Sequence, residues 1–229
     1  MDNYNEEQFK IDFPKTEIGK RLLAETPRWM TTRYSPVDYD AQPRDTVLTL
    51  RVAPFFYILK LLEKNPKQIA DIGCGSNFFK NFIPEIHGID PVENPNVDQV
   101  DYFDEDFSIG HTNKFDCAMA INSLHFISLT DITKQLNNFS NIIKPGGRGF
   151  ITFNVKRMIE VTKPSELIPN EQLSSHIKQQ VDLALSNVLA YDDYIFQQPD
   201  VVDDFYLNGH IRIVFEKEKW YGSNSKRYC

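Results

Sequence analysis

A short apolar run that ends in a glycine-rich turn is the part of the sequence best suited to hold a ligand. Residues Ile69–Ile72 have the composition of a buried parallel strand, and Gly73–Asn77 (GCGSN) follow at once, before the apolar segment Phe78–Ile83. Glycine permits a sharp turn and a close ligand because it has no Cβ. The N–H groups at the start of a following helix would face that ligand. The pattern predicts the nucleotide-binding corner of a doubly wound sheet.

A carboxylate stands at the end of the next predicted strand. Ile86–Asp90 (IHGID) is a short apolar run whose last residue lies 17 positions after Gly73. An acid there can accept hydrogen bonds from ribose hydroxyls. A dinucleotide fingerprint would also require a third glycine, but Phe78 occupies that position, and its bulk argues against close packing of helix and strand. The alternative pattern is acid-x-Gly-x-Gly, with Asp71 as the acid.

These two stretches resemble the first and second motifs of the class I S-adenosylmethionine-dependent methyltransferases. Asp71–Asn77 (DIGCGSN) is similar to the first motif, and Gly88–Asp90 (GID) is similar to the second. Asn77 replaces the family's usual third glycine, and asparagine tolerates left-handed backbone conformations better than most residues. The resemblance implies that S-adenosylmethionine is the cofactor and that residues in and beside these motifs bind it, namely Asp71, Gly73, Cys74, Gly75, Asn77, Asp90 and Pro91.

Later motifs extend the resemblance. In the family a carboxylate after the third strand holds the adenine amino group; here Asp104 is favoured and Asp101 is the alternative, although a solvated acidic loop would have the same composition. Phe115–Ile121 is the clearest buried strand, and Asn122 stands at its carboxyl end, where open sheets bind their ligands. Lys144–Gly147 (KPGG), between a predicted helix and a predicted strand, is a frequent junction in the family.

His125 is the candidate catalytic residue. Methyl transfer from a sulfonium mainly requires alignment of donor and acceptor, and a base is needed only when the acceptor is a weak nucleophile. His125 follows the fourth predicted strand on the ligand side of the sheet, so it is a candidate base, with a purely structural role in the turn as the alternative. The other histidines lack metal-ligand spacing, so no metal site is predicted.

The alternation of strand and helix patterns predicts the architecture that carries these residues. The expected fold class is α/β, a Rossmann-like doubly wound sheet of seven strands, mainly parallel, with a closing antiparallel hairpin. A helix is predicted over Asp131–Ile143 and the fifth strand over Gly149–Asn154. The hairpin is predicted from Asp203–Leu207 and His210–Phe215, joined by the Asn-Gly turn between them.

Two parts of the chain are expected, an N-terminal arm or lid over residues 1–44 and a methyltransferase-like domain over residues 45–229. Thr16 is expected to cap a helix over Glu17–Glu25, and the rest of the arm is expected to be irregular. A helix from Asp45 to Leu62 is predicted to kink or split at Pro54. The arm either covers a sheet face or closes over a substrate pocket with its aromatic residues, Trp29, Tyr34 and Tyr39.

Composition narrows the substrates and the compartment. The chain has 229 residues with 25 basic and 32 acidic side chains, a formal charge of −7, which makes nucleic acid an unlikely substrate. A small molecule or a protein side chain is expected instead, and the Asn/Asp-Pro-Pro-aromatic signature of adenine methylation does not follow the fourth strand. Three unrelated cysteines, no signal-like N-terminus and no long apolar run favour a cytoplasmic protein without a membrane segment. The sequence does not determine the oligomeric state.

Two other functions remain open at this point. The first is a methyltransferase-like scaffold that binds the cofactor poorly and serves a partner protein, which the substitution at Asn77 keeps in view. The second is a nicotinamide-dependent oxidoreductase, which Phe78 disfavours. Binding of S-adenosylmethionine against nicotinamide dinucleotide separates the three, because fold alone does not.

Overall fold

The computed structural model describes residues 6–25, 52–124, 129–154, 193–197 and 210–217. The chain divides into two compact units, Met1–Glu63 and Lys64–Cys229. The predicted boundary between arm and domain, near residue 44, lies outside the described residues and stays a prediction. No helix in the described ranges is long and apolar enough to cross a membrane.

The described part of the first unit contains four short helical elements around a cluster of phenylalanines. These are α1 (Glu6–Asp12), the 3₁₀ turn η1 (Phe13–Lys15), α2 (Glu17–Glu25) and α5 (Ala53–Leu62). Phe9 stacks on Phe13 at 4.5 Å between ring centroids and also contacts Phe56 at 5.2 Å. Phe13 in turn stacks on Phe55 at 5.0 Å. The aromatic contacts therefore join the two ends of this unit's sequence into one core.

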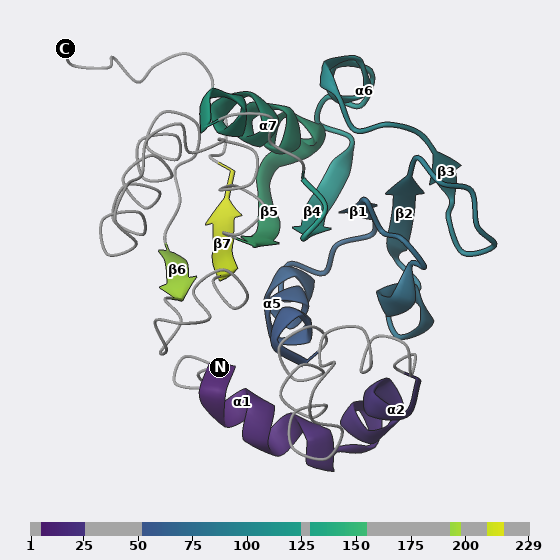
Figure 1. The fold of residues 1–229 in the computed structure, drawn as a ribbon, viewed down its shortest axis with the longest axis vertical. Coiled ribbons are helices and arrows are strands. Elements are labelled where there is room, and N and C mark those ends of the chain that lie inside the picture. The colour runs from purple at the N-terminus through teal and green to yellow at the C-terminus, as the bar shows by residue number, and fades with distance from the viewer. Residues whose placement is uncertain (1–5, 26–51, 125–128, 155–192, 198–209, 218–229) are drawn as a thin grey trace, which may run out of the picture. The chain divides into compact units, whose positions relative to one another are not determined.

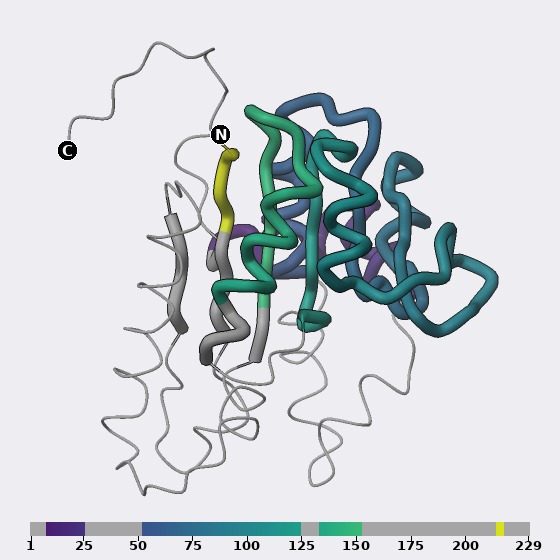
Figure 2. Tube along the Cα trace, turned by 90° about the horizontal axis from the view of Figure 1, so that it is seen from above, coloured from purple at the N-terminus to yellow at the C-terminus, as the bar shows by residue number. Residues whose placement is uncertain are grey.

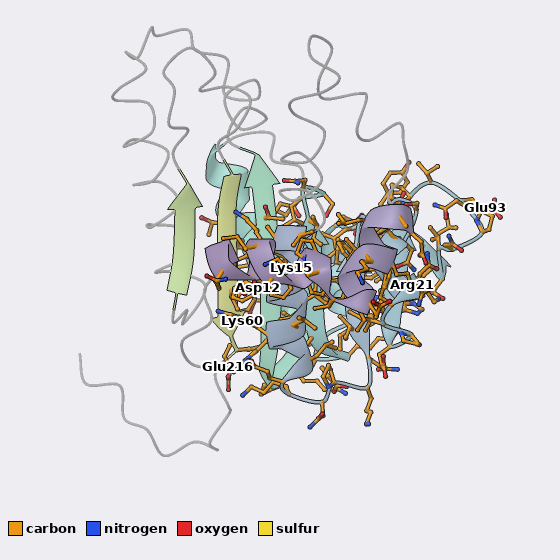
Figure 3. All side chains as sticks on the ribbon, turned by 90° about the horizontal axis from the view of Figure 1, so that it is seen from below. Asp12, Lys15, Arg21, Lys60, Glu93 and Glu216 are labelled. Carbon is orange, nitrogen blue, oxygen red and sulfur yellow. The ribbon has the colours of Figure 1, made fainter. Side chains whose placement is uncertain are left out.

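The predicted helix over Glu17–Glu25 is confirmed, together with its cap. The Gly19 N–H donates to Thr16 Oγ1 at 3.0 Å. A Cβ on Gly19 would lie 1.8 Å from the Phe13 carbonyl oxygen, so only glycine permits this close approach. The exposed ion pair of Asp12 and Lys15, at 3.0 Å, lies on the surface of the same unit (Figure 3).

One expectation for this unit differs from the structure, and a second is tested only in part. Residues 6–12 form α1 rather than an irregular segment, because Phe9 on that helix has aromatic partners to pack against. Pro54 lies in the first turn of α5, where a proline breaks no helical hydrogen bond and need not kink the helix. The upstream part of the predicted helix falls on residues 45–51, outside the described residues.

The second unit is built on a seven-stranded sheet, which confirms the predicted fold class. Its strands lie in the order β3-β2-β1-β4-β5-β7-β6, with β3 and β6 at the two edges (Figure 1). The first five are parallel, and β7 is antiparallel to both β5 and β6. The strands are β1 (Ile69–Ile72), β2 (Ile86–Asp90), β3 (Gln99–Val100), β4 (Phe115–Ile121), β5 (Ile143–Asn154), β6 (Asp193–Gln197) and β7 (His210–Glu216).

The partner predicted for the last strand is wrong. β7 pairs with β5 along one side and with β6 along the other. The prediction paired this strand with Asp203–Leu207 instead, a segment that lies outside the described residues. The Asn-Gly turn lies outside the described residues.

Helices α6 (Glu105–Gly110) and α7 (Leu129–Ile142) lie side by side (Figure 2). The Ser108 hydroxyl donates to the Asn138 carbonyl at 3.1 Å, and the Asn141 side chain donates to the Ser108 carbonyl at 3.1 Å. Leu136 and Phe139 are fully buried, as the predicted helical spacing requires. α7 contacts β4 and β5, so it positions the centre of the sheet.

The crossovers between the first three strands contain almost no helix. After β1 the chain forms only a 3₁₀ turn, η3 (Phe78–Asn81), in place of the predicted α-helix. Pro84 follows three residues later and β2 begins at Ile86, which leaves little chain for further helical turns. Residues 91–98, which we call the β2–β3 loop, likewise contain no helix.

The predicted Lys-Pro-Gly-Gly junction forms a bulge at the start of β5. Phe115 of β4 pairs with Ile143, but Cys117, two residues on, pairs with Arg148. Gly147 needs to be glycine because a Cβ there would lie 2.3 Å from the Asp116 carbonyl oxygen. The Asp116 side chain accepts from Lys144 at 2.6 Å and from the Lys67 backbone N–H at 2.8 Å, which ties the bulge to the start of β1.

Candidate functional site

The sequence motifs meet at the carboxyl ends of β1 to β4. Gly73 donates its backbone N–H to the Ile89 carbonyl at 2.8 Å, so the glycine turn is joined to the end of β2. The Asp101 N–H donates to the Asp90 carbonyl at 3.1 Å, which joins β2 to the chain after β3. Asn122 follows β4 with a left-handed backbone, and its N–H donates to the Thr152 carbonyl at 2.7 Å. Gly73, Asp90, Asp101 and Asn122 therefore all lie at the carboxyl ends of their strands, on the same side of the sheet, as parallel strands require.

Three residues of the turn have positive φ angles. These are Gly73 at 64°, Gly75 at 55° and Asn77 at 48°. Left-handed conformations favour glycine and, after it, asparagine, which is why Asn77 can stand where the related motif has its third glycine. A Cβ on Gly73 would meet Ser123 Cβ at 2.4 Å, whereas a Cβ on Gly75 would meet no heavy atom of the described residues within 4 Å. The turn is thus closed at Gly73 and open at Gly75.

Asp90 is buried directly beside this opening. Its Oδ2 accepts the Gly75 N–H at 2.8 Å, and its Oδ1 accepts the Val92 N–H at 2.9 Å. Each carboxylate oxygen has a second lone pair, so the group can still accept a hydroxyl donor. Asp71, by contrast, lies within β1, paired with Gly88 on one side and Met119 on the other, and is 4% exposed.

Asp101 and Asp104, the two candidates for the acid after the third strand, occupy different positions. Asp101 is hydrogen-bonded to the end of β2, as described, and its side chain accepts from Gln99 Nε2 at 3.1 Å and from the Tyr102 N–H at 2.9 Å. Asp104 caps α6 by accepting the Phe107 N–H at 2.9 Å. Asp101 is therefore the acid that the structure joins to Asp90, whereas Asp104 serves a helix terminus.

The β2–β3 loop contains polar residues that sequence reasoning missed. Asn94 Nδ2 donates to the Gly75 carbonyl at 2.5 Å, and Asn96 Nδ2 donates to the Ser76 carbonyl at 3.2 Å. Asn77, which is fully buried, donates from Nδ2 to the Asn96 carbonyl at 2.7 Å. We call the side chains of Asn77, Asn94 and Asn96 the asparagine bracket. The Asn-Pro-Asn run at 94–96 was the available signal, since asparagine often bonds to nearby backbone.

Asp98 anchors the far end of the same loop. Its carboxylate accepts the Gly88 N–H at 2.8 Å and pairs with Lys80 of η3. Burial alone would raise the pKa of Asp98, but the hydrogen bonds from Lys80 and from the Gly88 N–H outweigh it and lower the pKa. Pro91 begins the loop and is exposed, and Figure 3 shows Glu93 at its outer end.

Cys74, in the middle of the turn, is chemically quiet. Burial, reinforced by the negative charges of Asp71 and Asp90, raises the pKa of its thiol to about 12. The thiolate is the reactive form of cysteine, so Cys74 is not a nucleophile near neutral pH. Its side chain packs beside Gly88, and its backbone is positioned by the left-handed glycines on either side, Gly73 and Gly75.

The described residues of the site suit the nucleoside end of S-adenosylmethionine. The open space at Gly75 is a cradle that a side chain could fill, and Asp90 is the buried carboxylate hydrogen-bonded beside it. His125 lies outside the described residues and stays a prediction. No cluster of histidine, cysteine, aspartate or glutamate suited to a metal ion occurs within the described ranges.

Comparison with known proteins gives structural likenesses at low sequence identity. No family model and no curated protein matches the sequence. Similar solved structures include the N-methyltransferase NodS of Bradyrhizobium japonicum (12% identity, 72% of this chain, 95% of that chain, TM-score 0.48). A second is an S-adenosylmethionine-dependent methyltransferase of Methanosarcina mazei (14% identity, 71% of this chain, 97% of that chain, TM-score 0.47). A third is a mutant of the 16S rRNA (adenine(1408)-N(1))-methyltransferase of Catenulisporales acidiphilia (12% identity, 73% of this chain, 93% of that chain, TM-score 0.42).

One of these structures is of an rRNA methyltransferase, and the comparisons give no support to the prediction that nucleic acid is an unlikely substrate. The observed strands and motifs also agree with those predicted from the sequence. Five parallel strands followed by the antiparallel pair of β6 and β7 match the predicted architecture, and the two principal motifs lie at the carboxyl ends of β1 and β2. In strand arrangement and in these motifs, the chain resembles the class I S-adenosylmethionine-dependent methyltransferases.

Proposed function

We propose that this protein is an S-adenosylmethionine-dependent methyltransferase that acts on a small molecule or a protein side chain. The observation that carries the proposal is the arrangement of Gly75 and Asp90. The turn is open at Gly75, and the Gly75 N–H fixes the buried carboxylate of Asp90 beside that opening. A buried acceptor next to an open backbone turn suits a ribose lying over glycine.

The roles of the chain's own residues follow from their positions. Gly73 turns the backbone against Ser123, Gly75 leaves room for the ligand, and Asp90 accepts from the ribose hydroxyls. Asp101 is the better candidate to accept the adenine amino group, because its backbone is bonded to Asp90 at the end of β2, whereas Asp104 caps α6. Pro91 and Asn122 border the same edge of the sheet. S-adenosylmethionine, when bound, supplies an electrophilic methyl group, and the protein aligns the acceptor with it.

His125 remains the proposed base for an acceptor that must lose a proton. Replacement by glutamine would test this through the pH profile of methyl transfer. A base contributes to the rate and not to cofactor affinity, so turnover should fall while binding of S-adenosylmethionine is unchanged. Equal turnover in the two proteins would leave His125 with a structural role only.

The proposed function is tested by calorimetry with the purified full chain. S-adenosylmethionine should bind with one site per chain, and nicotinamide dinucleotide should not. Phe78 explains the second expectation, because it is 6% exposed and its ring packs on Phe79 at 5.4 Å and Phe82 at 5.6 Å. The buried ring fills the position where a dinucleotide-binding protein has the glycine that allows close approach of the pyrophosphate. Binding of the dinucleotide alone would overturn the proposal.

A methyltransferase-like scaffold for a partner protein is the second candidate. It is favoured by η3, since a four-residue 3₁₀ turn gives a ligand no full helix N-terminus beside the glycine turn. A scaffold would keep the fold but bind S-adenosylmethionine poorly. Absence of binding at millimolar cofactor, with a folded protein, would favour this candidate over the enzyme.

The N-terminal arm remains a proposed wall of the acceptor pocket on the basis of its composition. Its aromatic segment, residues 29–43, lies outside the described residues. Deletion of residues 1–43 is a poor test, because it removes Phe9 and Phe13, which pack on Phe56 and Phe55. Replacement of Trp29 by alanine in the full chain is better. Turnover should fall with cofactor affinity unchanged, and an equal loss of both would contradict the lid.

A further inference from the structure

The asparagine bracket controls the orientation of two peptide groups in the glycine turn. Asn94 holds the Gly75 carbonyl and Asn96 holds the Ser76 carbonyl, both toward the β2–β3 loop. In a trans peptide the carbonyl and the following N–H point in opposite directions. The Ser76 N–H must therefore point away from the loop, and it has no acceptor among the described residues. The bracket thus turns one free backbone donor outward.

The asparagine bracket also replaces the support that a helix after the turn would give. A full α-helix after the turn would fix its last peptide groups through helical hydrogen bonds. Here η3 has four residues, and its first residue follows directly on Asn77. Asn77 bonds to the Asn96 carbonyl, and Asp98 pairs with Lys80 of η3. Side chains of the neighbouring loop thereby replace part of the missing helical support.

We infer that Asn94 and Asn96 are positioning residues for the cofactor, which hold the glycine turn in the conformation that presents the Ser76 N–H and the opening at Gly75. This inference rests on the proposed function. Neither asparagine has to touch the ligand; both act through the carbonyls of the turn. Without Asn94 the Gly75–Ser76 peptide group would lose the hydrogen bond that fixes its carbonyl. Without Asn96 the Ser76–Asn77 peptide group would be held only through its N–H, which donates to the Cys74 carbonyl at 2.9 Å. Both groups would then have more rotational freedom, and ordering them on binding would cost affinity.

The binding test uses Asn94→Ala and Asn96→Ala, which remove the side-chain donors without adding charge. Asn137→Ala is the matched control, because Asn137 is exposed on α7. Calorimetry with S-adenosylmethionine should show roughly three- to tenfold weaker binding for each bracket variant, the usual worth of one hydrogen bond. The control should bind like the wild-type protein.

A second measurement follows the turn itself and needs no cofactor. Cys74-Gly75 is the one Cys-Gly pair in the sequence, so labelling cysteine carbonyls with ¹³C and glycine amides with ¹⁵N selects the Gly75 signal. The Gly75 N–H donates to Asp90, and the carbonyl of the same residue accepts from Asn94. Its resonance should move in Asn94→Ala and stay in place in Asn137→Ala. A loss of global stability alone would not shift this signal in the folded protein.

The outcomes separate the inference from the proposed function. Wild-type binding with equal affinity in both bracket variants would overturn the inference and leave the function standing. Weaker binding with an unmoved Gly75 signal in Asn94→Ala would also overturn it, since the effect would not pass through the turn. No binding by the wild-type protein would overturn the proposed function, and the cofactor role of the bracket with it.

Discussion

Gly88 and Asn77 are in such close contact that a single methyl group added between them should disturb the turn. Gly88 lies in β2, and a Cβ built there would be 2.2 Å from Asn77 Nδ2, 2.6 Å from Asn77 Cγ and 2.8 Å from Cys74 Sγ. Ordinary contacts between such atoms are about 3.5–4.0 Å. Asn77 is fully buried, so its side chain cannot simply swing into solvent. Gly88→Ala therefore forces Asn77 out of its position.

Gly88→Ala should lower the free energy of unfolding in two ways, by overpacking and by the loss of a hydrogen bond. Overpacking a filled interior costs about 1–3 kcal/mol. Loss of the 2.7 Å hydrogen bond from Asn77 to the Asn96 carbonyl adds about 1 kcal/mol. The free energy of unfolding should fall by roughly 2–4 kcal/mol in Gly88→Ala. Asn77→Gly loses this hydrogen bond, the longer one to Asp98 Oδ2 at 3.4 Å and the packing of a buried side chain, but glycine accepts the left-handed backbone. It should cost about 1–3 kcal/mol.

The double variant makes the prediction specific. With Asn77 reduced to glycine, the added methyl group enters the vacated space, and the half-buried Cys74 thiol can rotate away. Gly88→Ala in this background should cost at least about 1 kcal/mol less than in the wild-type protein, about twice the error of additivity. Urea unfolding of the four proteins measures the coupling. Additive costs would refute the claim that Asn77 and Gly88 compete for one space.

Three further predictions use the same site and its supports. Asp90→Asn should weaken S-adenosylmethionine binding by roughly ten- to hundredfold, because a charge-assisted acceptor is lost; equal affinity by calorimetry would exclude the ribose role. Cys74 should react slowly with iodoacetamide at pH 7 and faster as the pH rises, since the pKa of its thiol is raised to about 12. Asp116→Asn should destabilise the protein above about pH 4, with the difference shrinking as the pH falls further. Burial would raise the pKa of Asp116, but hydrogen bonds from Lys144, Lys67 and Gln68 lower it, so the stability it contributes is lost only on protonation; a pH-independent difference would contradict this.

The strands and the turn could be predicted because their signals are local. β1, β2 and β4 are short apolar runs buried on both faces, which is how parallel strands read in a sequence. The left-handed conformations of Gly73, Gly75 and Asn77 follow from residue type. Asp90 and Asn122 come directly after or at the end of such runs, so their edge of the sheet was predictable as well.

The rest depends on contacts that leave no periodic pattern. Asn94 and Asn96 bond through side chains to the backbone of a turn about 20 residues earlier, and a polar loop of any shape would have similar composition. The sequence cannot fix which acid after the third strand, Asp104 or Asp101, would hold the adenine, because the length of that loop varies. In the structure the two differ in the cap of α6 and in the bond from the Asp101 N–H to the Asp90 carbonyl. The pairing of β7 with β6 could not be read from the sequence, since the Asn-Gly signal nearby is purely local.

The position of β5 has a consequence for synthesis of the chain on a ribosome. β5 lies between β4 and β7, but β7 begins at His210, about 55 residues after β5 ends at Asn154. At about 5–20 residues per second, one side of β5 is left without its partner for roughly 3–11 seconds. That side belongs to a strand that contains Phe150 and Ile151, so the nascent chain carries an apolar open edge during this interval. β5, an interior strand of the finished sheet, is therefore the segment for which a chaperone should compete during translation.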